Sequence, residues 1–343
     1  MHEAMLYSTL DDNKVACHLC GRRCTISEGK LGYCQVRKNN AGKLYSLVYG
    51  TACSANPDPI EKKPLWHFHP GSMVMSVATV GCNFRCLFCQ NWQISHESDI
   101  IGRKLSPVRI VDYAIKTGCT GVSYTYSEPT IFFEYAYDTA KIATEKGLFN
   151  TFVTNGYLTP EAIKTIAPFL DAATVDFKGS GSPAFYKKYC NVSSVDPIYD
   201  ALKAMKAAGI HIEVTNLLVT DVGDNVEEAE KLAQWLVTEL GENTPLHLLR
   251  FYPHHKMTNL SATPITTLES VAEACSRAGL KYIYLGNVPG HQGANTICAN
   301  CGALLIERLG VQTLSVRLTH EGHCPSCNLP FPIILSEDTK PSK

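Results

Sequence analysis

The sequence lacks a long hydrophobic run, a strong net charge and an internal repeat. Its first residues, MHEAMLYSTLDDNK, contain no apolar stretch of the kind that secretory signals need, and no later run approaches the length of a bilayer span. The 31 Lys and Arg residues nearly balance the 32 Asp and Glu residues, which gives no support for a nucleic-acid partner or a membrane-surface partner. We therefore expect a cytoplasmic protein that associates with neither.

Cysteine, by contrast, is abundant, with 15 in 343 residues. In a reducing cytosol, clustered cysteines are more often metal ligands or catalytic thiols than disulfides. Eleven of them form three clusters: Cys17, Cys20, Cys24 and Cys34; Cys82, Cys86 and Cys89; and Cys298, Cys301, Cys324 and Cys327. Four stand alone and are expected to be small buried apolar side chains: Cys53, Cys119, Cys190 and Cys275. The clustering indicates a metalloprotein.

The middle of the chain alternates short β-rich runs with helical patterns. The strand candidates are 72–80, 119–126, 149–155, 172–178, 210–219, 246–252 and 281–286. Ser106, Thr159 and Asp196 each precede a proline and are expected to cap the helix that follows. Glycines are expected to end the helical stretches, at positions 118, 147, 209, 241 and 279. Strand and helix, repeated about six times, predict a parallel sheet with right-handed crossovers.

The predicted architecture is an α/β fold in three parts. Residues 72–290 are expected to form a partial (β/α)6 TIM-like barrel. Residues 1–71 lack the alternation and are expected to form a cysteine-containing N-terminal extension. Residues 291–343 are expected to form a small C-terminal domain that ends in the polar, frayed SEDTKPSK.

Polar side chains follow the predicted strands at their C-terminal ends, where chemistry gathers in such barrels. They are Ser127, Glu128, Asn155, Asp176, Lys178, Thr215, Asn216, His247 and Arg250. Alternation along a strand places His247 and Arg250 on opposite faces, so they face the same rim only if the phase of that strand is right. We take Lys178 and Arg250 as catalytic candidates, and His247 as a candidate cofactor contact.

The loop GCNFRCLFCQNW carries three cysteines at the spacing Cys-x3-Cys-x2-Cys: Cys82, Cys86 and Cys89. A structural zinc ion would need a fourth protein ligand, and His96 is the nearest candidate, although a solvated loop histidine is its simpler interpretation. A cluster of four irons and four sulfides offers four iron corners, of which three thiolates can hold three. We therefore expect the last iron to bind a substrate.

The pattern Cys-x3-Cys-x-Phe-Cys resembles the signature of the radical S-adenosylmethionine (radical SAM) superfamily. The resemblance implies a [4Fe-4S] cluster whose open iron binds SAM, and reductive cleavage of SAM to a 5′-deoxyadenosyl radical that abstracts hydrogen. It implies that Phe88 packs near the adenine, that Glu128 meets the methionine amine, and that Asn155 contacts the ribose or the carboxylate. Asp176 and Lys178 resemble the Asp-x-Lys of activating-enzyme-like members, with Lys178 suited to the methionine carboxylate.

Longer stretches resemble the AmmeMemoRadiSam system radical SAM enzyme, a relative of pyruvate formate-lyase activating enzymes. They are CHLCGRRCTISEGKLGYCQVR, DPIEKKPLWHFHPGS, GCNFRCLFCQNWQIS, YIYLGNVPG and NTICANCG, in that order. The resemblance implies a Memo-like partner protein, an electron donor of the flavodoxin or ferredoxin type, and a peptide, protein or small-molecule substrate. Two alternatives stay open. One is a glycyl-radical-enzyme activating enzyme, and the other is a non-catalytic binding or regulatory protein in which the metals only stabilise the structure.

The two remaining cysteine clusters predict further metal sites. Cys298-x2-Cys301 and Cys324-x2-Cys327 are paired knuckles that predict a zinc ribbon, with a mononuclear iron site of rubredoxin type or an auxiliary cluster as alternatives. The N-terminal four have the spacing Cys-x2-Cys-x3-Cys-x9-Cys. They could hold a second zinc ion or an auxiliary iron–sulfur cluster, or they could be structural or form disulfides.

Overall fold

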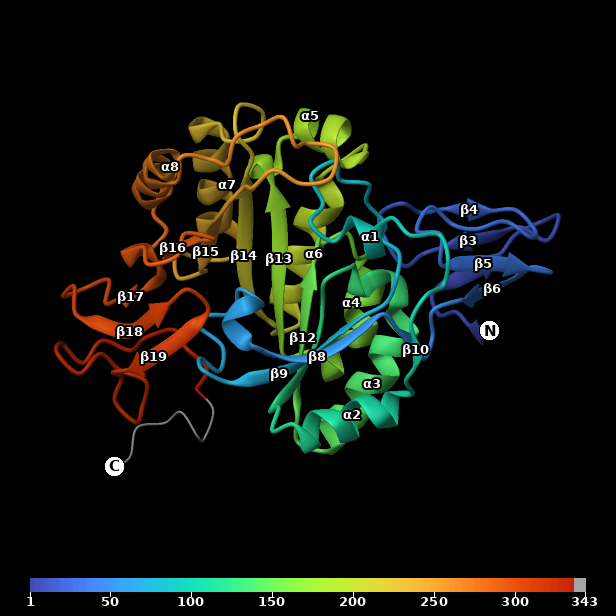
Figure 1. The fold of residues 1–343 in the computed structure, drawn as a ribbon, viewed down its shortest axis with the longest axis horizontal. Helices are drawn as coiled ribbons and strands as arrows, with labels where there is room; N and C mark the ends of the chain where they lie inside the picture. Colours follow the sequence, from blue (N-terminus) through green and yellow to red (C-terminus); the bar gives the residue numbers. More distant parts are fainter. Residues whose placement is uncertain (336–343) are drawn as a thin grey trace.

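The computed structural model describes residues 1–335, so the polar segment at 336–343 lies outside the described residues. Its centre is one eight-stranded sheet (Figure 1) with the order β16-β15-β14-β13-β12-β11-β9-β8. The strands are β8 (Ser54–Pro59), β9 (Met73–Ala78), β11 (Gly121–Tyr124), β12 (Phe149–Thr154), β13 (Ala172–Lys178), β14 (His211–Leu218), β15 (Leu246–Arg250) and β16 (Ile283–Gly286). The last seven are mutually parallel, and each coincides with a predicted strand. Within residues 1–335 the sheet is open, with β8 and β16 at its edges.

Helices connect the parallel strands, as the alternation predicts. They are α1 (Trp92–Ser95), α2 (Pro107–Lys116), α3 (Phe133–Glu145), α4 (Pro160–Ile166), α5 (Pro183–Phe185), α6 (Asp196–Ala207), α7 (Val226–Glu239) and α8 (Ile265–Arg277). Short 3-10 turns occupy Ile60–Lys62, Pro129–Phe132, Ala167–Phe169, Gly179–Gly181 and Gln292–Ala294, and a π-helical turn occupies Tyr186–Cys190. No helix of residues 1–335 is long and apolar enough to cross a membrane.

The predicted caps of α2 and α4 are confirmed. The Ser106 hydroxyl accepts from the Arg109 N–H, and the Thr159 hydroxyl accepts from the Ala162 N–H. The predicted cap at Asp196 is wrong, because Asp196 already lies in the first turn of α6. There the hydroxyl of Ser194, two residues earlier, accepts from the Asp196 N–H at 3.1 Å.

Strand β8 belongs to the central sheet although it precedes residue 72. It pairs antiparallel with β9 from Ser54 opposite Ala78 to Pro59 opposite Met73. Pro57 and Pro59 make the segment SANPDP unlike a central strand, but an edge strand tolerates proline because one of its sides donates no ladder hydrogen bonds. The N-terminal part of the chain therefore contributes one edge strand to the central sheet.

The remaining strands form small sheets at the two ends of the long axis of the molecule (Figure 1). At one end lie β1 (His2–Glu3), β6 (Lys43–Ser46) and β5 (Arg37–Asn40), and beside them β2 (Tyr7–Thr9), β3 (Val15–Cys17) and β4 (Thr25–Ile26). At the other lie β17 (Thr296–Ile297), β18 (Leu304–Leu309) and β19 (Gln312–Val316). A two-stranded sheet joins β7 (Thr51–Ala52) to β10 (Arg103–Lys104).

The N-terminal sheets are attached through a buried ion pair. The guanidinium of Arg37 donates to both carboxylate oxygens of Glu134 on α3, at 2.9 and 3.1 Å, and both side chains are at most 2% exposed. The carboxylate also accepts from the Met5 N–H at 2.7 Å. A bidentate pair of this kind holds its partners in one geometry.

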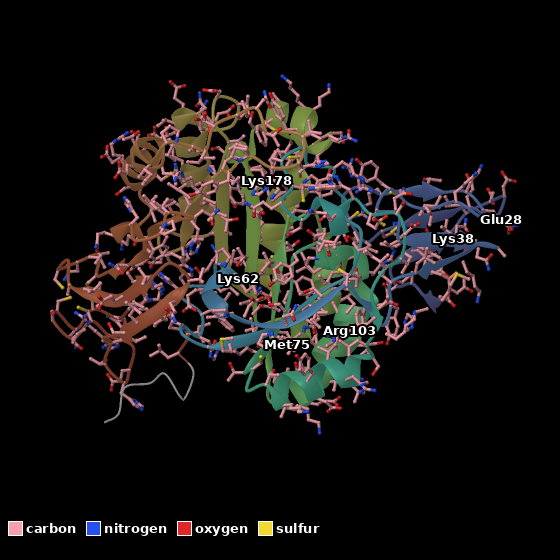
Figure 2. All side chains as sticks on the ribbon, in the orientation of Figure 1. Glu28, Lys38, Lys62, Met75, Arg103 and Lys178 are labelled. Carbon is pink, nitrogen blue, oxygen red and sulfur yellow. The ribbon has the colours of Figure 1, made fainter. Side chains whose placement is uncertain are left out.

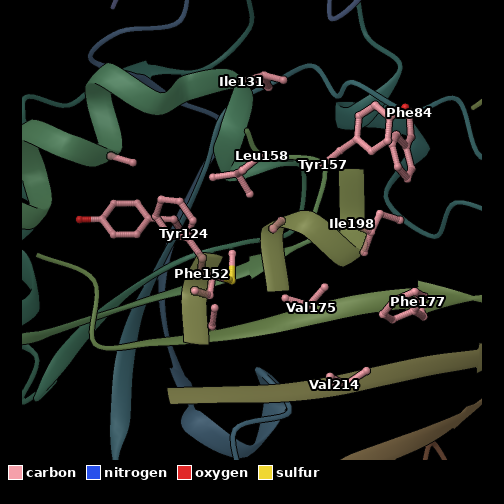
Figure 3. Packing of buried hydrophobic residues seen from close by; sticks show 14 of the residues in the cluster. Phe84, Tyr124, Ile131, Phe152, Tyr157, Leu158, Val175, Phe177, Ile198 and Val214 are labelled. Carbon is pink, nitrogen blue, oxygen red and sulfur yellow. The ribbon is translucent and has the colours of Figure 1, made fainter. Parts of the chain in front are cut away.

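The main core lies between the sheet and its helices (Figure 3). Neighbouring strands contribute Phe152, Val175 and Val214, which pack with Leu158 and with helix residue Ile198. Burying such side chains stabilises the fold by about 1.5–3 kcal/mol each. This packing holds the C-terminal ends of the strands in fixed positions.

Candidate active site

A cavity of about 560 Å³ opens at the C-terminal ends of the parallel strands. Eight of the predicted site residues line it together: Cys82, Cys86, Phe88, Cys89, Glu128, Asn155, Asp176 and Lys178. They come from the loop after β9 and from the ends of β11, β12 and β13. Figure 2 shows Lys178 at the end of β13. Residues distant in the sequence therefore converge on one space.

The cysteine loop is held by backbone hydrogen bonds to the π-helical turn Tyr186–Cys190, which follows α5. The N–H groups of Arg85 and Leu87 donate to the carbonyls of Cys190 and Tyr189, at 3.1 and 2.9 Å. The loop begins at Gly81, whose φ of 96° lies in the region that favours glycine. A Cβ there would come within 2.7 Å of Val36. The loop conformation therefore depends on contacts with two other parts of the chain.

The donor set fits an iron–sulfur cluster with one open iron. Among the described residues that line the cavity there are three cysteines and no histidine. His96 does not line it, and its ring packs instead against His255. The three thiols are not gathered around one point, because residues 1–335 contain a single group of three or more ligand atoms within 4.8 Å of one another, and that group lies elsewhere. Each thiolate of a cluster binds its own iron, so wider spacing is expected.

Glu128 ties together the ends of β11 and β12. Its Oε1 accepts from the Thr130 N–H at 3.0 Å and from the Thr154 hydroxyl at 2.7 Å. Its Oε2 accepts from the Asn155 N–H at 2.8 Å, the one protein donor to that oxygen among residues 1–335. Burial raises the pKa of the Glu128 carboxyl, while the N–H of Asn155 and the hydroxyl of Thr130 act to lower it. Oε2 retains a lone pair for a further donor.

Lys178 and Asp176 form a close pair on the cavity wall. The Lys178 Nζ lies 2.5 Å from Asp176 Oδ2, and the Thr215 hydroxyl donates to Asp176 Oδ1 at 2.8 Å. Burial acts to lower the pKa of Lys178, but the charge and hydrogen bond of Asp176, together with the neighbouring thiols of Cys86 and Cys190, raise it overall. Lys178 therefore stays cationic and presents a positive charge to an anionic group in the cavity.

The structure does not bring His247 and Arg250 to the cavity, so both sequence-based assignments need correction. The His247 Nε2 lies 2.7 Å from Glu213 Oε2 on the neighbouring strand, and both side chains are almost fully buried. Its ring packs against Trp66. Arg250 donates through Nε to the Thr263 carbonyl at 2.7 Å. Neither side chain lines the cavity, although Arg250 donates through Nη1 to the hydroxyl of the cavity residue Tyr252 at 3.1 Å.

The wall also includes polar residues that the sequence patterns did not indicate. Tyr126 and Lys62 line the cavity, and both contact Asp58 on the edge strand β8, with Lys62 Nζ at 2.8 Å from Asp58 Oδ1. Ser127, which was predicted at the same strand end as Glu128, lines the cavity too, and its hydroxyl is buried without a partner among the described residues. A buried orphaned hydroxyl costs free energy, which suits a wall that meets a polar ligand. Asp58 and Lys62 belong to the segment DPIEKK, and the sequence patterns did not predict that this segment adjoins the central sheet.

The C-terminal cysteines are gathered as a single ion requires. The four Sγ atoms lie within 4.8 Å of one another, with Cys298 Sγ at 3.7 Å from Cys327 Sγ and Cys301 Sγ at 3.6 Å from Cys324 Sγ. A tetrahedral zinc with Zn–S of about 2.3 Å places its sulfurs at about this separation.

Of the four isolated cysteines, three are buried as predicted and Cys53 is half-buried.

Comparison with known proteins agrees with this geometry. Residues 76–236 match the Radical SAM superfamily. The uncharacterized protein MJ0808 of Methanocaldococcus jannaschii is 47% identical over 338 residues, which cover 98% of this chain and 100% of that protein. The pyruvate formate-lyase-activating enzyme of Clostridium pasteurianum is 24% identical over 186 residues, covering 52% of this chain and 76% of the other.

A solved structure supports the same fold. A radical SAM methyltransferase from Sphaerobacter thermophilus superposes with a TM-score of 0.50 at 18% identity, over 69% of this chain and 71% of that one. Residues 76–236 match the superfamily model, and the three cysteines lie at the C-terminal edge of a parallel sheet, so this chain belongs to the radical SAM superfamily.

Proposed function

We propose that this protein is a radical SAM enzyme that holds a [4Fe-4S] cluster through Cys82, Cys86 and Cys89 and binds SAM in the adjoining cavity. The observation that carries the proposal is the cavity wall itself. Three cysteine thiols, a buried carboxylate and a buried ammonium share one space of about 560 Å³, and no fourth cysteine or histidine among the described residues lines it. Three thiolates suit a cluster with one free iron, and a carboxylate beside an ammonium suits a ligand that carries both an amine and a carboxylate.

The side chains of the cavity would orient SAM. Glu128 Oε2 can accept from the methionine amine, and the Lys178 ammonium can bind the methionine carboxylate. Phe88 is buried against Phe185 and supplies an apolar surface for the adenine. Asn155, whose Nδ2 donates to Asn83 Oδ1 at 2.7 Å, is held rigidly at the same wall. When bound, the cluster and SAM supply reductive cleavage to a 5′-deoxyadenosyl radical.

The substrate that we propose is a peptide, a protein or a small molecule from which hydrogen is abstracted. An external electron donor of the flavodoxin or ferredoxin type would reduce the cluster. A Memo-like partner, membership of the AmmeMemoRadiSam group and a cytoplasmic location stay predictions. Glycyl-radical activation is a second candidate function, because Asp176-x-Lys178 stands on the cavity wall and the chain is similar to a pyruvate formate-lyase-activating enzyme.

We also propose that Cys298, Cys301, Cys324 and Cys327 hold zinc. Their sulfur separations support a four-thiolate tetrahedral site closed to substrate. Closed coordination assigns this zinc a structural role, since no ligand position is left for catalysis.

The test of the enzyme is formation of 5′-deoxyadenosine. The protein is reconstituted with iron and sulfide without oxygen and then given dithionite and SAM. We expect 5′-deoxyadenosine from the wild type and none from Cys86→Ala, whereas Cys119→Ala, a matched loss of a buried thiol outside the cavity, retains the activity. Absence of product from a wild type that holds its iron would favour the non-catalytic alternative.

A further inference from the structure

A second pocket brings the four N-terminal cysteines together. Cys17, Cys20, Cys24 and Cys34 line it jointly, although up to 17 positions separate them along the chain. Part of the wall is formed by the apolar side chains of Leu19, Ile26 and Ile131. Four thiols facing one small, mostly apolar space indicate a bound inorganic group, because thiols that served only as core side chains would have no reason to converge.

These four thiols are not drawn together as the ligands of a single ion are. Among residues 1–335, the C-terminal cysteines alone gather three or more ligand atoms within 4.8 Å of one another. The N-terminal four do not meet that limit, and neither do Cys82, Cys86 and Cys89. One chain thus contains a tight set that fits zinc and two wider sets. A zinc ion draws its four sulfurs together, whereas a [4Fe-4S] cluster spreads them over four irons.

Two buried side chains of this pocket have donors without partners. Arg37 lines the pocket at 2% exposure, and its Nε is buried and unpaired, although its two terminal nitrogens are bound to Glu134 and the Met5 carbonyl. Asn83 also lines it, fully buried, and its Nδ2 is unpaired while its Oδ1 accepts from Asn155. An unpaired buried donor is costly. Cluster sulfides and thiolates are acceptors that would satisfy both donors.

The second pocket adjoins the first. Asn83 of the second pocket follows Cys82 of the first directly in the chain. Arg22 of the second pocket donates through Nε to the Asn83 carbonyl at 2.9 Å. Cys24 lines the second pocket and is half-buried, so the pocket approaches the surface there.

We propose that Cys17, Cys20, Cys24 and Cys34 hold a second [4Fe-4S] cluster that relays electrons to the first. A low-potential one-electron donor, a flavodoxin or ferredoxin, reduces the second cluster by one electron near Cys24. That electron passes by way of Asn83 to the first cluster, and the second cluster returns to its oxidised state. No covalent bond forms or breaks. The relay rests on the proposed function, whereas the cluster site itself does not.

The cluster site is tested by removing the ligands of the first cluster. Wild-type protein reconstituted with iron and sulfide should hold about eight irons, because each cluster contains four. The triple variant Cys82→Ala, Cys86→Ala, Cys89→Ala should keep about half of this iron, with an EPR signal after dithionite that SAM does not shift. A triple variant without iron, or a wild type with half the iron and zinc at two sites, overturns the proposal.

The relay is tested with the double variant Cys24→Ser, Cys34→Ser. It should lose half of the iron and keep the EPR signal that SAM shifts. Dithionite should still reduce the first cluster, whereas reduced flavodoxin should no longer do so. The matched double variant Cys119→Ser, Cys275→Ser, also at buried cysteines, should behave as the wild type. Unchanged reduction by flavodoxin in the first variant overturns the relay.

The outcomes separate the two proposals. If the wild type holds about eight irons but its first cluster does not bind SAM, the proposed function is refuted and the proposed second cluster is supported. If the double variant does not fold, the iron content of the triple variant still decides the second site.

Discussion

At the scale of single residues, the cavity is lined by buried polar groups that use most of their hydrogen-bonding capacity within the protein and keep the remainder for a ligand. Glu128 is the clearest case, since protein donors occupy Oε1 and a single backbone N–H occupies Oε2. The cysteines, Glu128 and Lys178 could be found from sequence because few other residue types bind a cluster, an amine or a carboxylate. His247 and Arg250 could not be placed, because the phase of a strand depends on packing against residues such as Trp66, which lies far away in the sequence.

Replacing Glu128 by Gln should weaken SAM binding without unfolding the protein. The amide keeps an acceptor but loses the charge, and a hydrogen bond to a charged group contributes about 1.5–3 kcal/mol, or roughly a tenfold to hundredfold change in Kd. Equilibrium dialysis of SAM with reconstituted protein measures this. Glu61→Gln is a matched control, because Glu61 is also buried and accepts from the Gly71 N–H and the Thr313 hydroxyl but does not line the cavity. Equal Kd values for Glu128→Gln and the wild type would refute the assigned contact.

At the scale of elements, Glu213 of β14 links strands and loops inside the fold. Its carboxylate lies 2.7 Å from His247 Nε2 and 3.2 Å from His211 Nε2, and it accepts from the His67 N–H at 2.7 Å. Burial acts to raise the pKa of Glu213, but the hydrogen bonds from His211 and His247 and the nearby His247 and His67 rings together place the pKa well below 4.5. Strand order followed from the alternation of elements, whereas this network joins residues up to 180 positions apart and has no local signature.

His247→Ala should lower the free energy of unfolding by about 3–5 kcal/mol, because it removes one of the two closest partners of the buried Glu213 carboxylate. In a folded variant, the Kd for SAM should not change. His291→Ala is the control: its partner Glu269 is 48% exposed, so the cost should stay below about 1 kcal/mol. Urea denaturation measures both, and equal losses would contradict a buried network.

The pH dependence of the same network has a definite sign. Because the folded pKa of Glu213 lies below 4.5, its ionisation stabilises the fold above pH 4.5, and that contribution is lost as the pH falls through the folded value. The difference in unfolding free energy between wild type and Glu213→Gln should therefore narrow in acid. A difference that grows below pH 4.5 would show that the carboxylate is not paired in the folded state.

At the scale of the whole molecule, the C-terminal sheet is packed onto the central one by mixed apolar and charged contacts. Arg308 of β18 donates to the Trp66 carbonyl at 2.8 Å and lies over its indole ring at 4.8 Å. Trp66, Tyr284, Cys298 and Cys324 belong to one buried cluster. The cysteine spacing predicted the ribbon, but the surface on which it docks depends on Trp66, which sequence analysis did not single out.

Removing the C-terminal metal should therefore be visible at Trp66. We expect Cys301→Ala to lose one zinc per chain by atomic emission and to shift tryptophan fluorescence to the red, because the indole becomes exposed to water. Trp66→Phe in the same background should abolish the shift. The iron content should not change. Retention of zinc, or iron in its place, would refute the assigned metal.

The buried pair of Arg37 and Glu134 bears on how the protein can be divided. A fragment beginning at residue 72 would strand the carboxylate of Glu134 inside α3 and strip the neighbouring strand β8 from β9. The central sheet therefore cannot be separated from the N-terminal residues. A fragment without them would expose an unpaired strand edge and bury an unpaired charge, so we expect it to aggregate instead of folding.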